Sequence, residues 1–382
     1  MVGQEELPII DSMTMNKNIL LIISGALLFT ACSQWTTPEE KQIDHIGGYA
    51  TMDNEESEAY YESLRAWKAT AVNNARPISY GYFSNWAPTG ALRKGYLSAL
   101  PDSIDMVSMW SGTPAKSELT EAQAADKAMA QKKGIKLLNV TLLSHLGKGL
   151  TPESAYTEVN NKAKAENWSD SKLNEERKKA RWAYWGFTSG DFDDQDLYDA
   201  ISKFAKAYYD FLLENEWDGI DIDWEPGIGF NDADGTFNTT TMTYFIKELG
   251  KYMGPKSDPE GKGHKIICID GLFSHFPDEI AEYVDYFIEQ AYSRMPFMSV
   301  PGDDYRKLIV VANFESNFKS GGYLLRHANW MPSNGQYKGG IGAYRLDNDY
   351  NNSPDYKWMR QAIQLNLQKF EEWKKAQGKT NE

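Results

Sequence analysis

The stretches Lys265–Gly271 (KIICIDG) and Lys307–Phe314 (KLIVVANF) are short and almost continuously apolar. Strands of this kind belong in a parallel sheet that is covered on both faces. Similar β-rich runs recur along the chain, with helical or loop segments between them. The full set is Ile78–Phe83, Asp105–Trp110, Ile135–Leu143, Gly219–Trp224, Lys265–Gly271, Val284–Tyr292, Lys307–Phe314 and Gly339–Leu346. Eight such strands predict an α/β fold of the (β/α)8 TIM barrel type.

The helical segments support this barrel unevenly. Apolar residues recur at helical spacing through Leu197–Leu212, and another helix is expected over Tyr60–Val72. At the C-terminus we expect Ser353 to cap a helix and Pro354 to occupy its first position, with an apolar stripe over Tyr356–Phe370.

Two connections depart from a regular barrel. Ser293–Arg306, between the sixth and seventh strands, holds two prolines and a glycine and leaves little room for a full helix. Leu146–Asp196, after the third strand, is instead long, charged and rich in tryptophan. We therefore expect some short or missing helices, and an insertion that shapes a cleft on the loop face.

Composition limits the possible partners and cofactors. The chain has 382 residues, 41% of them hydrophobic, and a formal charge of −14, which repels phosphate backbones. We expect no nucleic-acid partner. The two cysteines, Cys32 and Cys268, are too few for a disulfide scaffold, and no Cys/His cluster has zinc spacing. We predict neither a metal nor a cofactor.

The N-terminal region has the pattern of a targeting signal. Residues 15–31 hold Lys17 and then the apolar run Ile19–Phe29, the pattern of a signal peptide; the run is too short to span a membrane comfortably, which takes about 20 residues. The alternative is a core helix. Leu28–Cys32 (LFTAC) resembles the lipobox of bacterial lipoproteins, which implies lipidation of Cys32.

These features suggest a domain plan. Residues 1–14 are acidic, unlike a signal-peptide start, so we expect an over-extended reading frame with Met15 as the true start. Residues 32–59 are expected to form a polar tether, and residues 60–382 a single barrel domain. The expected location is the bacterial outer membrane, on its cell-surface or periplasmic face, with membrane contact through the lipid only.

The segment Asp218–Glu225 (DGIDIDWE) carries the chemistry. Because alternate side chains of a strand share a face, Asp221, Asp223 and Glu225 point one way. Three carboxyl groups inside a barrel repel one another, so at least one should keep a proton near neutral pH and serve as a general acid. The segment also ends at the carboxyl end of a strand, where barrel enzymes place their active sites.

Other interpretations of this segment remain. A calcium loop would need the glycine and distal glutamate of an EF-hand, which are missing, and Pro226 follows Glu225 directly. The acids could serve structure alone, although three buried acids are costly where apolar residues would do. A magnesium site is also conceivable, but its ligands usually come from successive strands.

Asp218–Glu225 resembles, position for position, the D-G-x-D-x-D-x-E signature of the family-18 glycoside hydrolases. This family comprises chitinases, endo-β-N-acetylglucosaminidases and inactive lectin-like relatives. The resemblance extends to the strand layout over residues 77–377 and to Gln290-Ala291-Tyr292 after the sixth strand. A Q-x-Y sequence at this place is similar to the endo-β-N-acetylglucosaminidase branch, whereas chitinases more often carry M-x-Y.

The resemblance implies substrate-assisted retaining catalysis through an oxazolinium intermediate. It implies that Glu225 is the acid and then the base, that Asp223 accepts the N–H of the sugar's 2-acetamido group, and that Asp221 shares a proton with Asp223. Tyr292 would donate to the acetamido oxygen, and Gln290 would help to hold the same group.

Departures from the family pattern weaken the chitinase reading. The S-x-G-G pattern after the third strand is only partly kept in Ser144–Gly147 (SHLG), Pro226 replaces the tyrosine that often follows the glutamate, and the eighth strand lacks the chitinase tryptophan near Tyr344.

Aromatic residues make up 13% of the chain, and sugars stack well on such rings. The candidates for substrate binding are Trp86, Trp110 and Tyr344, at or near strand ends. Trp330 and Tyr337 could touch more distant sugars. The lone histidines His145 and His275 are expected to be structural.

The resemblance thus implies an endo-β-N-acetylglucosaminidase that hydrolyses the GlcNAc-β-1,4-GlcNAc core of N-linked glycans on glycoproteins. The alternatives are a chitinase-type hydrolase of other GlcNAc-containing oligosaccharides or polymers, and a non-hydrolytic glycan-binding protein. The intact Glu225 favours catalysis.

Overall fold

The computed structural model describes residues 56–71, 75–228, 230 and 232–378. Ser57–Glu382 form one compact unit. The predicted signal peptide, the lipidation at Cys32 and most of the tether lie outside the described residues. Within the described part of the chain, no helix combines the length and the apolar character needed to cross a bilayer.

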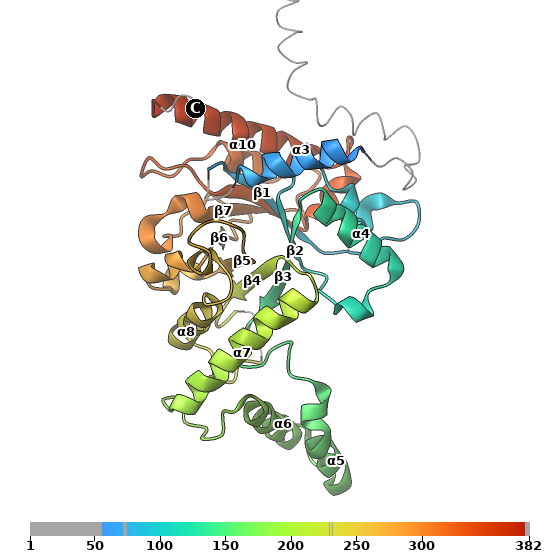
Figure 1. Cartoon of the computed structure of the whole chain (residues 1–382), viewed down its shortest axis with the longest axis vertical. Helices are drawn as coiled ribbons and strands as arrows, with labels where there is room; N and C mark the ends of the chain where they lie inside the picture. Colours follow the sequence, from blue (N-terminus) through green and yellow to red (C-terminus); the bar gives the residue numbers. More distant parts are fainter. Residues whose placement is uncertain (1–55, 72–74, 229, 231, 379–382) are drawn as a thin grey trace, which may run out of the picture. The chain divides into compact units, whose positions relative to one another are not determined.

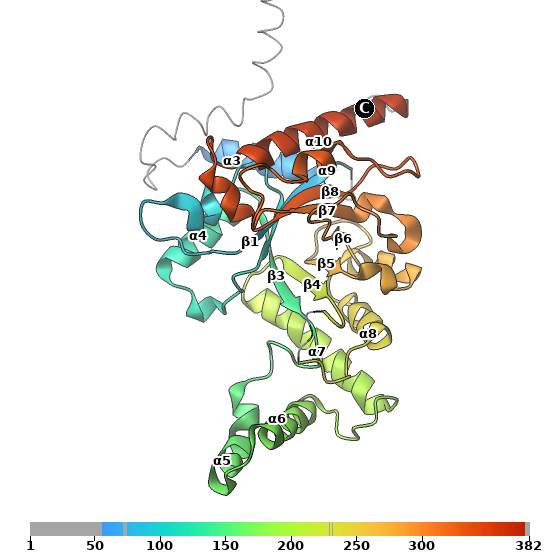
Figure 2. The same ribbon diagram turned by 180° about the vertical axis from the view of Figure 1, so that it is seen from behind.

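The core of the fold is a closed barrel of eight parallel strands in sequence order, which confirms the predicted TIM barrel (Figures 1 and 2). The predicted strand Val284–Tyr292 is the one that shortens most, so that Gln290 and Tyr292 lie just beyond its end. The strands are β1 (Ile78–Phe83), β2 (Met106–Met109), β3 (Lys136–Leu142), β4 (Gly219–Trp224), β5 (Ile266–Gly271), β6 (Tyr286–Glu289), β7 (Leu308–Asn313) and β8 (Gly340–Tyr344).

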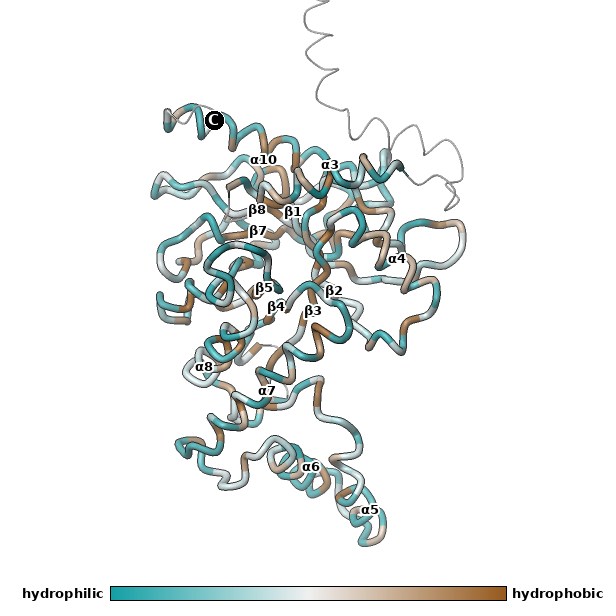
Figure 3. The backbone as a smooth tube through the Cα atoms, viewed as in Figure 1, coloured by the Kyte–Doolittle hydropathy of each residue, from teal (hydrophilic) through white to brown (hydrophobic). Residues whose placement is uncertain are grey.

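Alternation along the strands creates two apolar cores, one inside the barrel and one between the barrel and its helices. The inner core is small and includes Tyr80, Met106, Leu138 and Ile309. The outer core is much larger and buries the opposite faces of the same strands. Figure 3 shows the strand segments in brown, as expected for strands that are buried on both faces.

The helices surround the barrel incompletely. Between β1 and β2, β5 and β6, and β6 and β7, the described chain forms only short 3-10 turns, which confirms the expected short or missing helices. The helices that pack on the barrel through the outer core are α4 (Glu121–Lys132), α7 (Gln195–Glu214), α8 (Thr239–Leu249), α9 (Leu324–Asn329) and α10 (Lys357–Ala376). Helix α3 (Glu58–Ala69) instead contacts the chain before β2 through Lys68, which donates to the carbonyl of Ile104 at 2.5 Å.

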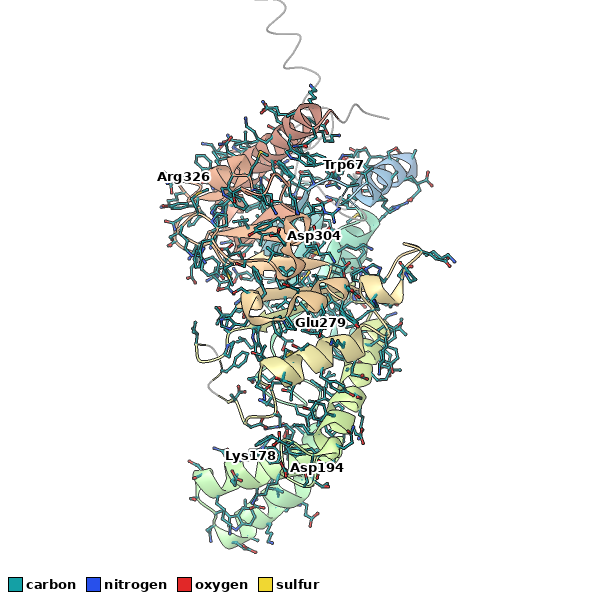
Figure 4. The ribbon with its side chains drawn as sticks, turned by 90° about the vertical axis from the view of Figure 1, so that its left-hand side faces the viewer. Trp67, Lys178, Asp194, Glu279, Asp304 and Arg326 are labelled. Atoms are coloured by element: carbon teal, nitrogen blue, oxygen red, sulfur yellow. The ribbon has the colours of Figure 1, made fainter. Side chains whose placement is uncertain are left out.

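The predicted insertion after the third strand consists of α5 (Thr157–Glu166) and α6 (Asp170–Trp185). Both helices project away from the barrel in Figures 1 and 2, and their colour in Figure 3 is mostly teal to white. In Figure 4, Lys178 of α6 lies at one end of the structure, near Asp194 at the start of α7, and Trp67 of α3 lies at the other end.

The start of α10 differs from the prediction. Ser353 and Pro354 lie ahead of the helix, which begins at Lys357 after Tyr356 takes a left-handed conformation (φ 53°). The cap comes from Asp349, whose carboxylate accepts the backbone N–H groups of Met359 (2.8 Å) and Trp358 (3.4 Å). A carboxylate at this place satisfies free N–H groups and complements the helix dipole.

Asp349→Ala should therefore lower the free energy of unfolding by about 1–3 kcal/mol, because this fully buried carboxylate caps the helix that closes the barrel. Urea unfolding followed by circular dichroism measures the loss. Glu372→Ala, which removes an exposed ion pair with Lys369 on the same helix, is the control and should cost less than about 1 kcal/mol. Equal losses in the two variants would contradict the capping role.

Candidate active site

The acidic residues of β4 lie at the mouth of the barrel. Asp221 and Asp223 are 0% and 2% exposed, while Glu225, just past the strand, is half-buried. Ile220, Ile222 and Trp224 alternate with them and pack into the outer core. The strand therefore directs its carboxyl groups inward, as its sequence predicts.

Asp221 is held by hydroxyl groups that reach it across the barrel interior from β1 and β2. Its Oδ2 accepts hydrogen bonds from Tyr80 Oη on β1 (2.8 Å) and Ser108 Oγ on β2 (2.6 Å). Burial raises the pKa of Asp221 to about 6, although these hydrogen bonds favour the ionised form. Asp221 is thus mostly ionised at neutral pH and bound on the side of β1 and β2.

Asp223 faces a further carboxyl group, Asp270, on the adjacent strand β5, where the two residues stand opposite each other. Gln290 Nε2 lies 3.0 Å from Asp270 Oδ2 and 3.5 Å from Asp223 Oδ1. Tyr82 Oη donates to the same Asp270 oxygen at 2.5 Å. Sequence analysis missed Asp270, although it is the acidic residue in an otherwise apolar strand and has the inward parity of Cys268.

The two facing carboxyl groups hold protons tightly. Burial, followed by the charges of Glu225 and Asp221, raises the pKa of Asp223 to about 8. Burial, followed by the charges of Asp223 and Asp221, raises the pKa of Asp270 well above its usual range. At neutral pH this cluster therefore retains a proton, as expected for like charges held close together away from water.

Aromatic rings line the mouth above these acids. Tyr344 lies 5.4 Å from Tyr292, 5.9 Å from Tyr82 and 5.8 Å from Trp110, measured between ring centroids. Trp110 is 39% exposed and can stack on a ligand. Burial, and then the charges of Asp270 and Asp223, raises the pKa of Tyr292, so its phenol stays neutral and can donate a hydrogen bond. The structure thus brings Trp110, Tyr344 and Tyr292 to one place.

The other predicted aromatics pack on the outer core or on α10, and the predictions for Trp86 and Tyr337 are corrected because both side chains are buried. Trp86 is 7% exposed, and its indole N–H donates to Asp126 of α4 at 2.9 Å, within the outer core. Tyr337 is buried against α10 and donates to the carbonyl of Asn366 at 2.7 Å. Trp330 also packs on the outer core. These three aromatics lie in connections outside the strands. Such connections have no periodic pattern, so the sequence does not show whether their side chains face the site or the core.

The loop after Glu225 is fixed by the insertion. Asp234 accepts hydrogen bonds from Arg181 (2.6 Å) and Trp182 (2.7 Å), both on α6. This ion pair is largely buried, with side-chain exposures of 14% for Arg181 and 4% for Asp234. The distant helix α6 therefore holds the loop that borders the acid Glu225.

The two histidines stand apart from the acid cluster. Burial, followed by the positive charge of Arg181, lowers the pKa of His145 to about 4, and its Nδ1 lies 3.0 Å from Ser144 Oγ. It is therefore neutral at physiological pH. His275 is exposed, in a 3-10 turn after β5.

The donor set around the aspartates does not suit a metal ion. Hydroxyl and amide groups of Tyr80, Ser108, Tyr82 and Gln290 direct their hydrogens at the carboxylates. Calcium and magnesium require oxygen lone pairs aimed at the ion. Among the described residues, no group of three or more His, Cys, Asp or Glu side chains has an arrangement that could hold a metal.

Residues 36–173 and 165–323 match the family described as "Glycoside hydrolase family 18, BT1044-like". The chain belongs to glycoside hydrolase family 18. Its acidic signature at the end of β4 and its eight-stranded barrel are therefore features of a glycosidase family. No curated protein matches this family-18 sequence significantly.

Solved structures show the same family-18 fold. A selenomethionine form of BT1044 with a glutamate-to-glutamine substitution is 26% identical, with a TM-score of 0.62, and the alignment covers 83% of this chain and 95% of that chain. An endo-β-N-acetylglucosaminidase from Cordyceps militaris in apo form is 18% identical, with a TM-score of 0.52 and coverage of 82% and 97%. A doubly substituted form of the Cordyceps enzyme in complex with fucosyl-N-acetylglucosamine-Asn is 16% identical, with a TM-score of 0.54 and the same coverage.

The buried carboxyl group of Asp223 should make the protein less stable as pH rises. Its pKa moves from 3.8 to about 8 on folding, so the native pair of Asp223 and Asp270 keeps a proton that the unfolded chain releases, and stability falls across this window. Asp223→Asn should therefore melt at a higher temperature than wild type, by a margin that grows between about pH 4 and pH 8.

Asp232→Asn is the matched control of opposite sign. Against the effect of burial, hydrogen bonds from Lys148 and Ser144 lower the pKa of Asp232 to about 2, so its contribution is present above pH 3.8 and lost in acid. This variant should lose stability at neutral pH. A pH-independent difference between Asp223→Asn and wild type, in melting curves by differential scanning fluorimetry, would refute the assignment.

Proposed function

We propose that this family-18 protein is an endo-β-N-acetylglucosaminidase that hydrolyses the GlcNAc-β-1,4-GlcNAc core of N-linked glycans. The observation that carries the proposal is the grouping of Glu225 with Asp223, Gln290 and Tyr292 at one mouth of the barrel. This group supplies an acid beside donors and acceptors that match an acetamido group.

The proposed reaction has two steps. Glu225 gives its proton to the glycosidic oxygen while the substrate's 2-acetamido oxygen attacks C1, so the C1–O bond breaks and an oxazolinium forms. Glu225, now a carboxylate, then takes a proton from water, whose oxygen attacks C1 and reopens the ring. Both attacks occur at C1 from opposite faces, so the configuration is retained and no nucleophilic side chain is required.

The residues around Glu225 would position the acetamido group. Asp223 would accept its N–H, which orients the attacking oxygen and stabilises the positive charge of the oxazolinium. Tyr292 would donate to the acetamido oxygen. The amide of Gln290 contacts both Asp223 and Asp270, so it would help to hold the side of the site that the acetamido group contacts.

The Q-x-Y sequence at Gln290–Tyr292 favours N-glycan cores over chitin. The Cordyceps endo-β-N-acetylglucosaminidase that shares the fold binds fucosyl-N-acetylglucosamine-Asn, a sugar stub on asparagine. For this chain we propose N-glycoproteins as partners, reached from a lipid anchor at Cys32 on the bacterial outer membrane.

Incubation of the protein from residue 33 onward with N-glycoproteins should leave single GlcNAc residues on asparagine, detected by mass spectrometry. Glu225→Gln should lower kcat by about 100- to 10,000-fold, because it removes the general acid without changing the shape of the side chain. High-mannose, hybrid and complex glycans are tested separately, so the cleaved class is identified.

The alternatives have distinct outcomes. Cleavage of chitin oligosaccharides but of no glycoprotein would indicate a chitinase-type hydrolase. Saturable glycan binding by wild type, without turnover of any substrate, would indicate a binding protein on the same barrel.

Trp110 should contribute to substrate binding through its exposed ring. Trp110→Ala should raise KM by about 3- to 10-fold with a smaller change in kcat, because a stacking contact is worth about 0.5–1.5 kcal/mol. Trp110→Phe keeps an aromatic face and should restore most of the affinity. An Ala variant with unchanged KM would place the sugar away from this ring.

A further inference from the structure

Asp270 is a buried carboxyl group that the proposed reaction leaves without a role. It is 1% exposed and stands directly opposite Asp223 in the register of β4 and β5. A buried carboxyl group is costly unless it is hydrogen-bonded or neutralised. Its presence where an apolar residue would pack well calls for a functional reason.

The hydrogen bonds of Asp270 are unequally distributed. Tyr82 and Gln290 both donate to Oδ2, at 2.5 Å and 3.0 Å. No donor reaches the buried Oδ1 among the described residues. The carboxyl group of Asp223 lies within hydrogen-bonding reach of Asp270. An ionised Asp270 would leave one oxygen unsatisfied beside another carboxylate, whereas a protonated Asp270 becomes a donor to Asp223.

We propose that Asp270 is the positioning residue for Asp223, and that the two carboxyl groups share one proton which Asp270 donates to Asp223. This inference rests on the proposed function, because Asp223 is the residue that would receive the acetamido N–H. Tyr82 and Gln290 hold Asp270 in place from β1 and from the end of β6.

Asp221 is less suited to this role than the resemblance to the family implies. Its Oδ2 accepts from Tyr80 and Ser108 on the side of β1 and β2, and its Oδ1 is buried without a donor among the described residues, as in Asp270. What distinguishes Asp270 is its place directly opposite Asp223 and the bond of Gln290 to both of these carboxyl groups. Burial raises the pKa of Asp221 to about 6, which is less than the rise at Asp223. In this proposal Asp270 therefore takes the role that the resemblance to the family implies for Asp221.

The charged and titratable surroundings favour a single shared proton. Asp221 and Asp223 act on Asp270 from β4, Tyr82 from β1, Cys268 from its own strand and Tyr292 from beyond β6. One proton leaves a single negative charge on the pair, which fixes Asp223 as an acceptor and matches the positive charge of the oxazolinium.

Infrared spectroscopy detects the shared proton directly. At pH 7 wild type should show the C=O stretch of a protonated carboxyl group in difference spectra against Asp270→Asn. The band should shift in Asp223→Asn, because the acceptor changes from a carboxylate to an amide oxygen, and should stay in place in Asp221→Asn, the control with equal burial and the same chemical change. Absence of the band in wild type, or its loss in Asp221→Asn alone, would overturn the inference.

Kinetics on a cleaved N-glycoprotein separate positioning from a structural role. Asp270→Ala should lower kcat by about 10- to 100-fold, the value of a hydrogen bond to a charged group. Asp270→Asn, whose amide is a permanent donor, should regain at least a third of the loss in log kcat that Asp270→Ala causes. Its KM should stay nearly constant. Equal losses in the two variants, with melting temperatures lowered alike, would mean that Asp270 is only structural.

The two experiments fail independently. If wild type cleaves no GlcNAc substrate, the proposed function fails while the infrared spectra still decide whether the proton is shared. If wild type cleaves N-glycans but the spectra assign the proton to Asp221, the proposed function stands and the role of Asp270 is wrong.

Discussion

Three aspartate side chains lie inside the barrel, where water barely reaches them, and the architecture of the mouth follows from the need to satisfy them. Asp221 and Asp270 are met by hydroxyl groups from β1 and β2 and by the amide of Gln290. Each carboxyl group has one oxygen that accepts two of these donors, so an apolar residue in place of one donor would leave that buried oxygen with a single hydrogen bond. The polar lining is therefore a set of mutually dependent groups, and it can form only where closure of the barrel brings the strands into register.

Below this layer the barrel interior becomes apolar, with Met106, Leu138 and Ile309 filling the space. This division lets one small interior hold both a packed core and a charged site. The outer core supplies most of the buried apolar surface, so the stability of the barrel does not depend on the inner layer alone.

Sequence alone predicts the elements that local periodicity encodes. The strands, the insertion and the inward direction of Asp221 and Asp223 follow from patterns a few residues long. The inward direction of Asp270 follows from the same alternation, but its bonds to Tyr82 and Gln290 do not, because they depend on register between strands far apart in the chain. The same limit explains the displaced start of α10, whose cap is Asp349 rather than Ser353, and the burial of Trp86.

The ion pair between Arg181 and Asp234 joins two segments that are separate in sequence, the insertion helix α6 and the loop after β4. These two segments therefore depend on each other structurally. A chimera that exchanges only the loop between family members would leave Arg181 without its ion-pair partner Asp234. A chimera that exchanges only the insertion would leave Asp234 without Arg181. Substrate range in relatives of this protein should therefore change by joint replacement of both segments, and loop grafting should transfer them together.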